Sequence, residues 1–170
     1  PGRDARDPIE RPMADAILRA LRADPGSVLA FLPGQAEIRR TETLLKDRLD
    51  DPNVDVVALY GALDTSVQDR AIEPAPPGKR KVVLATSIAE TSITILGVRI
   101  VVDSGLARVP RYEPDVGLTR LETVRVSRAA AYVRAGYSDA EILEHDAECL
   151  RRERIRRALF GGRLQWRDAA

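Results

Sequence analysis

Hydroxyl and carboxylate side chains follow two apolar runs in the middle of the chain, at the points where each run stops. Thr86 and Ser87 come directly after the run Val82–Ala85, and Asp103-Ser104-Gly105 follows the run Val98–Val102. Short β-branched apolar runs are typical of strands buried on both faces of a parallel sheet. Ligands of such sheets bind just beyond the carboxyl ends of the strands. We therefore expect both polar turns at one edge, where their hydroxyl and backbone N–H groups would form a binding site.

Several catalytic and nucleotide-binding motifs are missing from the sequence. No G-x-x-x-x-G-K-[ST] phosphate-binding loop occurs, and Gly78-Lys79 precedes an apolar run instead of following one. The single histidine, His145, lies among charged residues, so no Ser-His-Asp or Cys-His set can be assembled. We expect no metal site, and the sequence looks incomplete as an enzyme on its own.

Charge and composition describe an ordinary globular domain of 170 residues. Lys and Arg total 27 against 26 Asp and Glu, so any basic surface for a nucleic acid must be local. A single cysteine, Cys149, excludes an internal disulfide framework. No apolar stretch approaches the ~20 residues of a membrane span, and the charged start is no signal peptide. We expect a cytoplasmic protein with no membrane partner, and the missing initiator methionine suggests a piece of a longer protein.

Apolar runs alternate with amphipathic stretches along the first hundred or so residues. Residues 1–11, rich in Pro, Arg and Asp, read as a linker, and Pro12 fits the first turn of a helix. Asp64 or Thr65 is placed to cap a later helix. Strands separated by helices at this spacing predict an α/β fold with a mainly parallel sheet. The expected strands are Val28–Leu32, Val54–Leu59, Lys81–Ala85 and Val98–Val102, and the expected helices are 12–23, Gln35–Leu49, Thr65–Ile72 and a short one within Ser87–Thr94.

The pattern changes after Gly105. Ala107–Tyr112 and Leu118–Val126 alternate apolar and polar residues around a Glu113-Pro114-Asp115 turn. This alternation predicts a hairpin that projects from the sheet. Beyond the hairpin we expect helices at Ser127–Ala135 and at Ser138–Phe160, and residues 163–170 are expected to fray.

Five short segments stand out because of their order along the chain. They are Phe31–Ile38, Leu59–Leu63, Glu73–Pro76, Ala85–Thr94 and Val101–Leu106, continued by Gly117–Thr123. The most specific is Ala85–Thr94, which reads ATSIAETSIT. In this order they resemble the second RecA-like lobe of DEAH-box RNA helicases, and most closely the bacterial HrpB-type branch. The resemblance covers roughly residues 26–131. It implies a RecA-like sheet of the P-loop NTPase type for residues 12–136, with a divergent helical tail at 137–170.

The resemblance implies that the lobe binds the backbone of single-stranded RNA, with DNA as an alternative, through contacts that carry no sequence information. Gly34 would offer its backbone N–H, because a glycine leaves room for close approach. Ser87 stands where the family usually has asparagine. The hairpin at 107–126 would match the family's strand-separating hairpin. The positions that match the family's nucleic-acid contacts are Gly34, Gln35, Thr86, Ser87 and Thr91.

The ATP-facing side departs from the family pattern. The resemblance implies that ATP and Mg²⁺ bind only in the complete protein, between this lobe and a preceding RecA-like lobe. No cofactor is expected to bind tightly to this chain alone, which we expect to lack ATP hydrolysis. Arg134 matches the first of the arginines that reach the ATP phosphate and stabilise phosphoryl transfer, but Val133 and Tyr137 replace a glutamine and the next arginine. Ile72 and Leu96 stand where an aromatic residue meets adenine and an acidic residue meets ribose.

Each motif also has a plain structural interpretation. Thr86 and Ser87 taken alone would more often cap the following helix than bind phosphate. The arginines at 151–157 lie among acidic residues and predict a solvated helix face. Two other functions stay open: a non-catalytic RNA-binding or interaction module derived from a helicase lobe, and a Rossmann-like nucleotide-binding domain. The altered arginine segment favours the first, and the lack of any G-x-G-x-x-G after a strand opposes the second.

Overall fold

The computed structural model describes residues 8–87, 95, 97–114, 117–127 and 164–165. Three helices and four parallel strands alternate through most of this part, and a hairpin follows them. The elements are α1 (Glu10–Ala23), β1 (Ser27–Phe31), α2 (Gln35–Arg48), β2 (Val54–Leu59), α3 (Thr65–Ile72), β3 (Arg80–Ala85), β4 (Val98–Asp103), β5 (Leu106–Glu113), β6 (Leu118–Arg125) and β7 (Leu164–Gln165).

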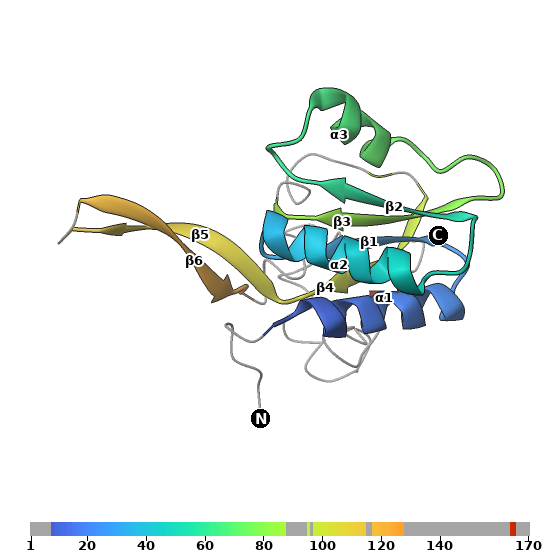
Figure 1. Ribbon diagram of the computed structural model, residues 1–170, viewed down its shortest axis with the longest axis horizontal. Helices are drawn as coiled ribbons and strands as arrows, with labels where there is room; N and C mark the ends of the chain where they lie inside the picture. Colours follow the sequence, from blue (N-terminus) through green and yellow to red (C-terminus); the bar gives the residue numbers. More distant parts are fainter. Residues whose placement is uncertain (1–7, 88–94, 96, 115–116, 128–163, 166–170) are drawn as a thin grey trace, which may run out of the picture.

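The main sheet has the strand order β2-β3-β1-β4-β7, and its first four strands run parallel (Figure 1). Every residue of β1 is buried, as are the last five residues of β3. Both strands lie inside the sheet with covered faces, which is why their sequences are unbroken apolar runs and show no alternation. The predicted α/β class and the mainly parallel sheet are confirmed.

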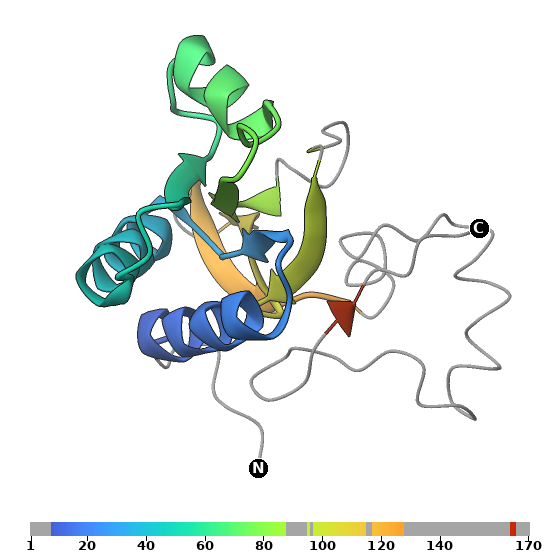
Figure 2. The ribbon, with the colours of Figure 1, turned by 90° about the vertical axis from the view of Figure 1, so that its right-hand side faces the viewer.

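Helices cover the sheet on both faces (Figure 2). Val28 and Ala30 of β1 point to the face that α1 and α2 cover, where they join the larger hydrophobic core. Leu29 and Phe31 point to the opposite face, where they pack with Ala71 of α3. Successive side chains of a strand alternate between the two faces. One short run therefore supplies both cores.

Two basic residues at the start of β3 bind the ends of helices on opposite faces. Arg80 Nη1 donates to the carbonyl oxygens of Leu21 and Asp24, each at 2.9 Å, at the C-terminal end of α1. Lys81 Nζ donates to the carbonyl oxygen of Arg70 at 2.5 Å and to that of Glu73 at 2.7 Å, at the end of α3. Terminal carbonyls of a helix lack partners within the helix and carry partial negative charge, so basic side chains stabilise them. The amino-terminal edge of the sheet is thus tied to a helix on each side.

The antiparallel pair β5 and β6 extends away from the main sheet (Figure 1). Its register runs from Leu106 opposite Arg125 to Glu113 opposite Leu118. Tyr112 and Leu121 lie on it with most of their surface exposed. The predicted projecting hairpin is confirmed, and its first strand begins one residue before the predicted start.

Two local details of the helices differ from the sequence-based expectations. Helix α1 begins at Glu10 instead of Pro12, because the ring of Pro12 is tolerated within a first turn and the preceding Ile9 is buried. Asp64 occupies the N-cap of α3, but its side chain makes no capping hydrogen bond; its carbonyl oxygen accepts from Val67 and Gln68 instead.

The expectation that residues 163–170 fray is wrong at two positions. Leu164 and Gln165 form β7 and pair antiparallel with Val101 and Ile100 of β4. An unpaired edge strand exposes a row of N–H and C=O groups, and β7 covers part of that row. The expected helices at Ser127–Ala135 and Ser138–Phe160 fall outside the described residues, except for Ser127. Among the described helices, none is both long enough and apolar enough to cross a membrane.

Candidate nucleic-acid interface

The carboxyl ends of the four parallel strands lie level with one another. Phe31, the last residue of β1, pairs with Ala85 of β3 on one side and with Asp103 of β4 on the other. Leu59, the last residue of β2, pairs with Ala85 in turn. The four strands stop at one line because each ends at a paired position. The polar turns that follow therefore share one edge of the sheet, as predicted.

Backbone hydrogen bonds join the first residues beyond this line. Each of these residues donates its N–H to the last carbonyl of a neighbouring strand, so the turns leave the sheet in fixed directions. The bonds are Thr86 N to Leu59 O (3.2 Å), Leu32 N to Ala85 O (2.8 Å) and Ser104 N to Phe31 O (3.0 Å). Thr86 and the Leu32-Pro33-Gly34 turn consequently start from adjacent strands of the same edge.

Gly34 sits at the N-cap of α2 in an extended conformation, with φ −166° and ψ 175°. A Cβ atom built on it would lie 2.6 Å from Nη1 of Arg108 and 3.0 Å from Oε2 of Glu37. The backbone angles of Gly34 suit any residue, and a side chain here would have to displace only the flexible end of Arg108. The sequence predicts an open approach to this backbone, whereas the structure places the Arg108 guanidinium against it.

Gln35 contacts Tyr60, the first residue after β2. Its Nε2 donates to the hydroxyl of Tyr60 at 3.2 Å, and Arg39 Nη2 donates to the same hydroxyl at 3.4 Å. Tyr60 is 6% exposed, so its ring is buried and its hydroxyl is the part that meets these polar groups. Sequence reasoning names Gln35 but misses Arg39. The spacing i, i+4 along α2, which places both residues on one side of the helix, is the signal that could have found it.

The hydroxyls of Thr86 and Ser87, which follow β3 at this edge, could donate hydrogen bonds to a ligand. Thr86 is half-buried and Ser87 is exposed. Neither side chain has a hydrogen-bond partner among the residues that the structure describes. A role in capping a following helix falls on residues 88–94, outside the described part.

The second polar turn serves the hairpin. Asp103 Oδ1 accepts from the N–H of Gly105 at 2.7 Å, and Ser104 Oγ accepts from the N–H of Leu106 at 3.2 Å. Asp103 and Ser104 are both buried. Side-chain groups bound to their own turn fix the direction in which the chain leaves the sheet. The expectation that this turn offers free polar groups to a ligand is wrong, because these groups hold the base of β5.

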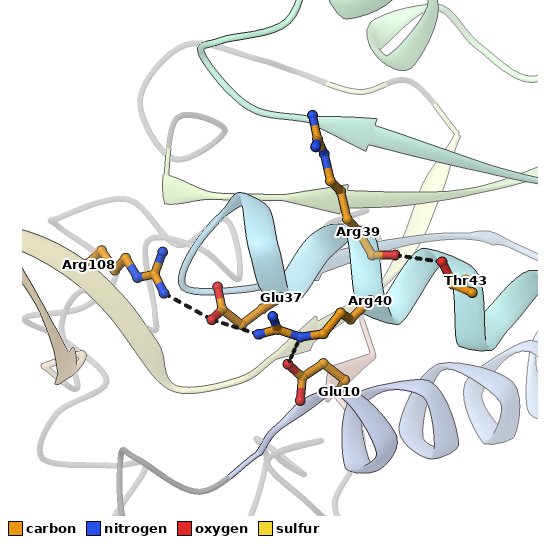
Figure 3. Close-up of polar contacts among 6 residues, drawn as sticks. All are labelled: Glu10, Glu37, Arg39, Arg40, Thr43 and Arg108. Carbon is orange, nitrogen blue, oxygen red and sulfur yellow. Dashed lines mark hydrogen bonds and ion pairs between the residues drawn. The ribbon is translucent and has the colours of Figure 1, made fainter.

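Four charged residues connect the hairpin to both helices of one face (Figure 3). Glu37 Oε1 accepts from Arg108 Nη2 at 3.0 Å and from Arg40 Nη2 at 3.3 Å. Arg40 Nε also donates to Glu10 Oε1 of α1 at 2.5 Å. Arg108 lies 71 residues from Glu37 in sequence, so no local pattern could reveal the pair.

Glu10 in this network has a shifted pKa. Burial opposes ionisation, but hydrogen bonds from its own backbone N–H and from Arg40, together with the Arg40 charge, lower the pKa of Glu10 below its ordinary value of 4.5. A carboxylate with a lowered pKa stabilises the folded state above its unfolded-state pKa, and this contribution is lost as the pH falls through the folded-state pKa.

Glu10→Gln should therefore lower the thermal midpoint at neutral pH and lose this effect in acid. Because Arg40 is 59% exposed, solvent screening keeps the neutral-pH cost below about 1 kcal/mol. Thermal unfolding at neutral pH and at several values below 4.5 measures the difference between variant and parent. Glu42→Gln, which removes the partner of the exposed Lys46 on α2, is the control for an ordinary surface pair. A difference for Glu10→Gln that does not change with pH would contradict the expectation.

The remaining predicted site residues are not brought together in the described part. Ile72 ends α3 and is half-buried. Thr91, Leu96 and Arg134 lie outside the described residues. In the described part of the chain, no group of three or more His, Cys, Asp or Glu side chains could hold a metal ion.

Comparisons with known proteins identify close relatives of this chain. Residues 12–132 match the family model described as the helicase conserved C-terminal domain. Over 124 residues the chain is 52% identical to the ATP-dependent RNA helicase HrpB of Escherichia coli (strain K12), covering 73% of this chain and 15% of that protein. Over 122 residues it is 42% identical to the pre-mRNA-splicing factor ATP-dependent RNA helicase DEAH10 of Arabidopsis thaliana, covering 69% and 17%.

A solved structure gives the same result. The crystal structure of the E. coli DExH-box NTPase HrpB superimposes with a TM-score of 0.72 at 50% identity, covering 78% of this chain and 16% of that one. The predicted RecA-like fold is confirmed. The chain spans about a sixth of the length of these relatives.

Proposed function

The chain belongs to the family of helicase conserved C-terminal domains, in the HrpB-like branch of the DEAH-box RNA helicases, and on this basis we propose that it holds the backbone of single-stranded RNA. The observation that carries the proposal is the shared sheet edge. Gly34 and Thr86 follow adjacent parallel strands whose last residues pair, and the hydroxyls of Thr86 and Ser87 lie beside them. Backbone N–H groups and small hydroxyls are typical donors to phosphate oxygens and read no base sequence.

The five residues proposed to contact the RNA backbone are supported by two different kinds of observation. Gly34, Gln35, Thr86 and Ser87 are supported by their common place at the carboxyl edge. Thr91 is supported by its position in the ATSIAETSIT segment. The hairpin β5–β6, which begins at the same edge, suits the proposed role of separating strands because it projects from the sheet (Figure 1).

The hydroxyls of Thr86 and Ser87 provide the test of this proposal. The double variant Thr86→Ala, Ser87→Ala should weaken binding of a fluorescently labelled oligouridine by about tenfold, because two donors to phosphate are lost at about 0.5–1.5 kcal/mol each. Fluorescence anisotropy at a series of salt concentrations measures the affinity, and single-stranded DNA of the same length as competitor measures the preference for RNA.

A matched control replaces a hydroxyl away from this edge. Thr43 lies in the second half of α2, where its hydroxyl donates to the carbonyl of Arg39. The variant Thr43→Ala should bind the oligonucleotide like the parent. If the Thr86→Ala, Ser87→Ala variant binds the oligonucleotide as tightly as the parent, these hydroxyls do not contact the phosphates and have only a structural role.

ATP use is the second part of the proposal. The named relatives are ATP-dependent RNA helicases, and we propose that the complete protein binds ATP and Mg²⁺ between this lobe and a preceding RecA-like lobe. Ile72, Leu96 and Arg134 would face ATP, as their place in the family pattern indicates. The cytoplasmic location expected from the sequence stays a prediction.

A non-catalytic RNA-binding module is the second candidate function. Val133 and Tyr137, which replace a glutamine and an arginine of the family pattern, favour it. RNA-stimulated ATP hydrolysis by the chain joined to its preceding lobe would support the helicase. RNA binding without ATP hydrolysis by the same protein would support the module.

A further inference from the structure

One basic side chain of the hairpin, that of Arg108, lies against the sheet edge at which the hairpin begins. Arg108 lies on β5, two residues into the strand, and its guanidinium lies against Gly34, with Nη1 2.6 Å from the position that a Cβ atom on Gly34 would take. The side chain of Arg108 is 35% exposed. A phosphate that approaches the backbone of Gly34 would therefore meet this guanidinium first.

Glu37 holds Arg108 in that position and is shared with a second arginine. Its Oε1 accepts from both Arg108 and Arg40, while its Oε2 is buried with no hydrogen-bond partner among the described residues. Oε2 also lies 3.0 Å from the position of a Cβ on Gly34. The carboxylate thus stands next to the path of an incoming phosphate and would repel it if Glu37 were left unpaired.

Arg40 provides the charge that keeps Glu37 paired when Arg108 moves. It contacts Glu37 from α2 and is held in place by Glu10 of α1 (Figure 3). Glu37 therefore keeps a cationic partner without Arg108. The guanidinium of Arg108, by contrast, has the planar fork that binds phosphate oxygens in a bidentate manner.

We propose that Arg108 exchanges partners: it pairs with Glu37 in the free lobe and with a backbone phosphate at Gly34 in the nucleic-acid complex, while Arg40 neutralises Glu37. This inference rests on the proposed function and adds a charged contact to it. Glu37 and the phosphate thus compete for Arg108. The affinity for nucleic acid depends on how strongly each of these two anions binds the guanidinium.

The exchange predicts opposite effects for the two partners. Glu37→Gln keeps the size of the side chain and removes the competing charge, so it should tighten oligouridine binding by about two- to fivefold, the scale of an exposed ion pair. Arg108→Gln should weaken binding by about five- to tenfold and make the slope of log affinity against log salt shallower by about 0.7, the value for one lost phosphate contact on a single strand. The double variant should behave like Arg108→Gln, because Glu37 acts only through Arg108.

The ion pair of Arg111 with Glu122 is the matched control. It lies on the same hairpin with the same two charge types, at 2.8 Å, and its arginine is 71% exposed. Glu122→Gln should leave oligouridine affinity within about twofold of the parent, since an exposed pair has little energetic weight. Thermal unfolding of every variant confirms that the fold is retained.

The outcomes separate this inference from the function on which it rests. Unchanged affinity and salt slope in Arg108→Gln, with binding still weakened in the Thr86→Ala, Ser87→Ala variant, would overturn the exchange and leave the proposed function standing. Weaker binding in Glu37→Gln would also overturn it, because Glu37 would then position Arg108 instead of competing for it. Absence of any binding by the parent chain would overturn both.

Discussion

Phe31→Ala is expected to lower the free energy of unfolding by about 3–5 kcal/mol, the range measured for large aromatic side chains in cores. Phe31 is 1% exposed and is the largest fully buried side chain of the described residues. It fills the core on the α3 face of the sheet, next to the small side chain of Ala85 on the neighbouring strand. Removing the ring leaves a cavity that Ala85 is too small to fill, so relaxation recovers little of the loss.

Chemical denaturation with two independent probes measures this change and tests whether unfolding stays two-state. Phe31→Leu is the control, since leucine keeps most of the buried apolar volume and should destabilise the fold much less than alanine does. A similar small cost for Phe31→Ala would mean that the α3 face of the sheet is not a packed core.

Lys81→Met is expected to lower the free energy of unfolding by about 2–4 kcal/mol. Methionine keeps the length of the apolar stem but leaves the carbonyls of Arg70 and Glu73 without their donor. Each hydrogen bond from a charged group contributes about 1.5–3 kcal/mol, and water can replace part of this at the two carbonyls, because both bonds are only part-buried. The increased hydrophobicity of methionine offsets part of the loss.

Lys79→Met is the matched control, because Lys79 is exposed two residues earlier. It should change stability by no more than about 0.5 kcal/mol, as is usual for surface substitutions. Hydrogen exchange adds a local measurement: amides of α3 should exchange faster in Lys81→Met, because the end of the helix loses its tie to β3. Equal stability of the Lys81 and Lys79 variants would show that the bonds to α3 are dispensable.

The layered part of the fold can be predicted from the sequence because its signals are local. The strand Val54–Leu59 and the helix Thr65–Ile72 have the predicted bounds, since β-branched runs and turn residues mark their ends. The common sheet edge could also be predicted, because parallel strands have their carboxyl ends on one side. The order of the strands cannot be predicted from such local signals, because the place of β3 between β1 and β2 depends on packing between residues far apart in the sequence.

The site was harder to predict than the fold because its contacts depend on side-chain directions. The sequence places Asp103 and Ser104 at the correct edge, but the hydrogen bonds to their own turn remove them from the set of free polar groups. Arg108 was missed because its position over Gly34 follows from the register and direction of a hairpin that begins beyond the sheet.

The strand order has a consequence for synthesis on the ribosome. Of the strands that the structure describes, the first two to be translated, β1 and β2, are not neighbours in the sheet, and β3, which pairs with both, begins at Arg80. When translation has reached Gly78, β1 and β2 therefore still lack the strand that lies between them. Long-range parallel pairing of this kind is intrinsically slow to form. The order in which the chain is translated therefore differs from the order in which the sheet can assemble.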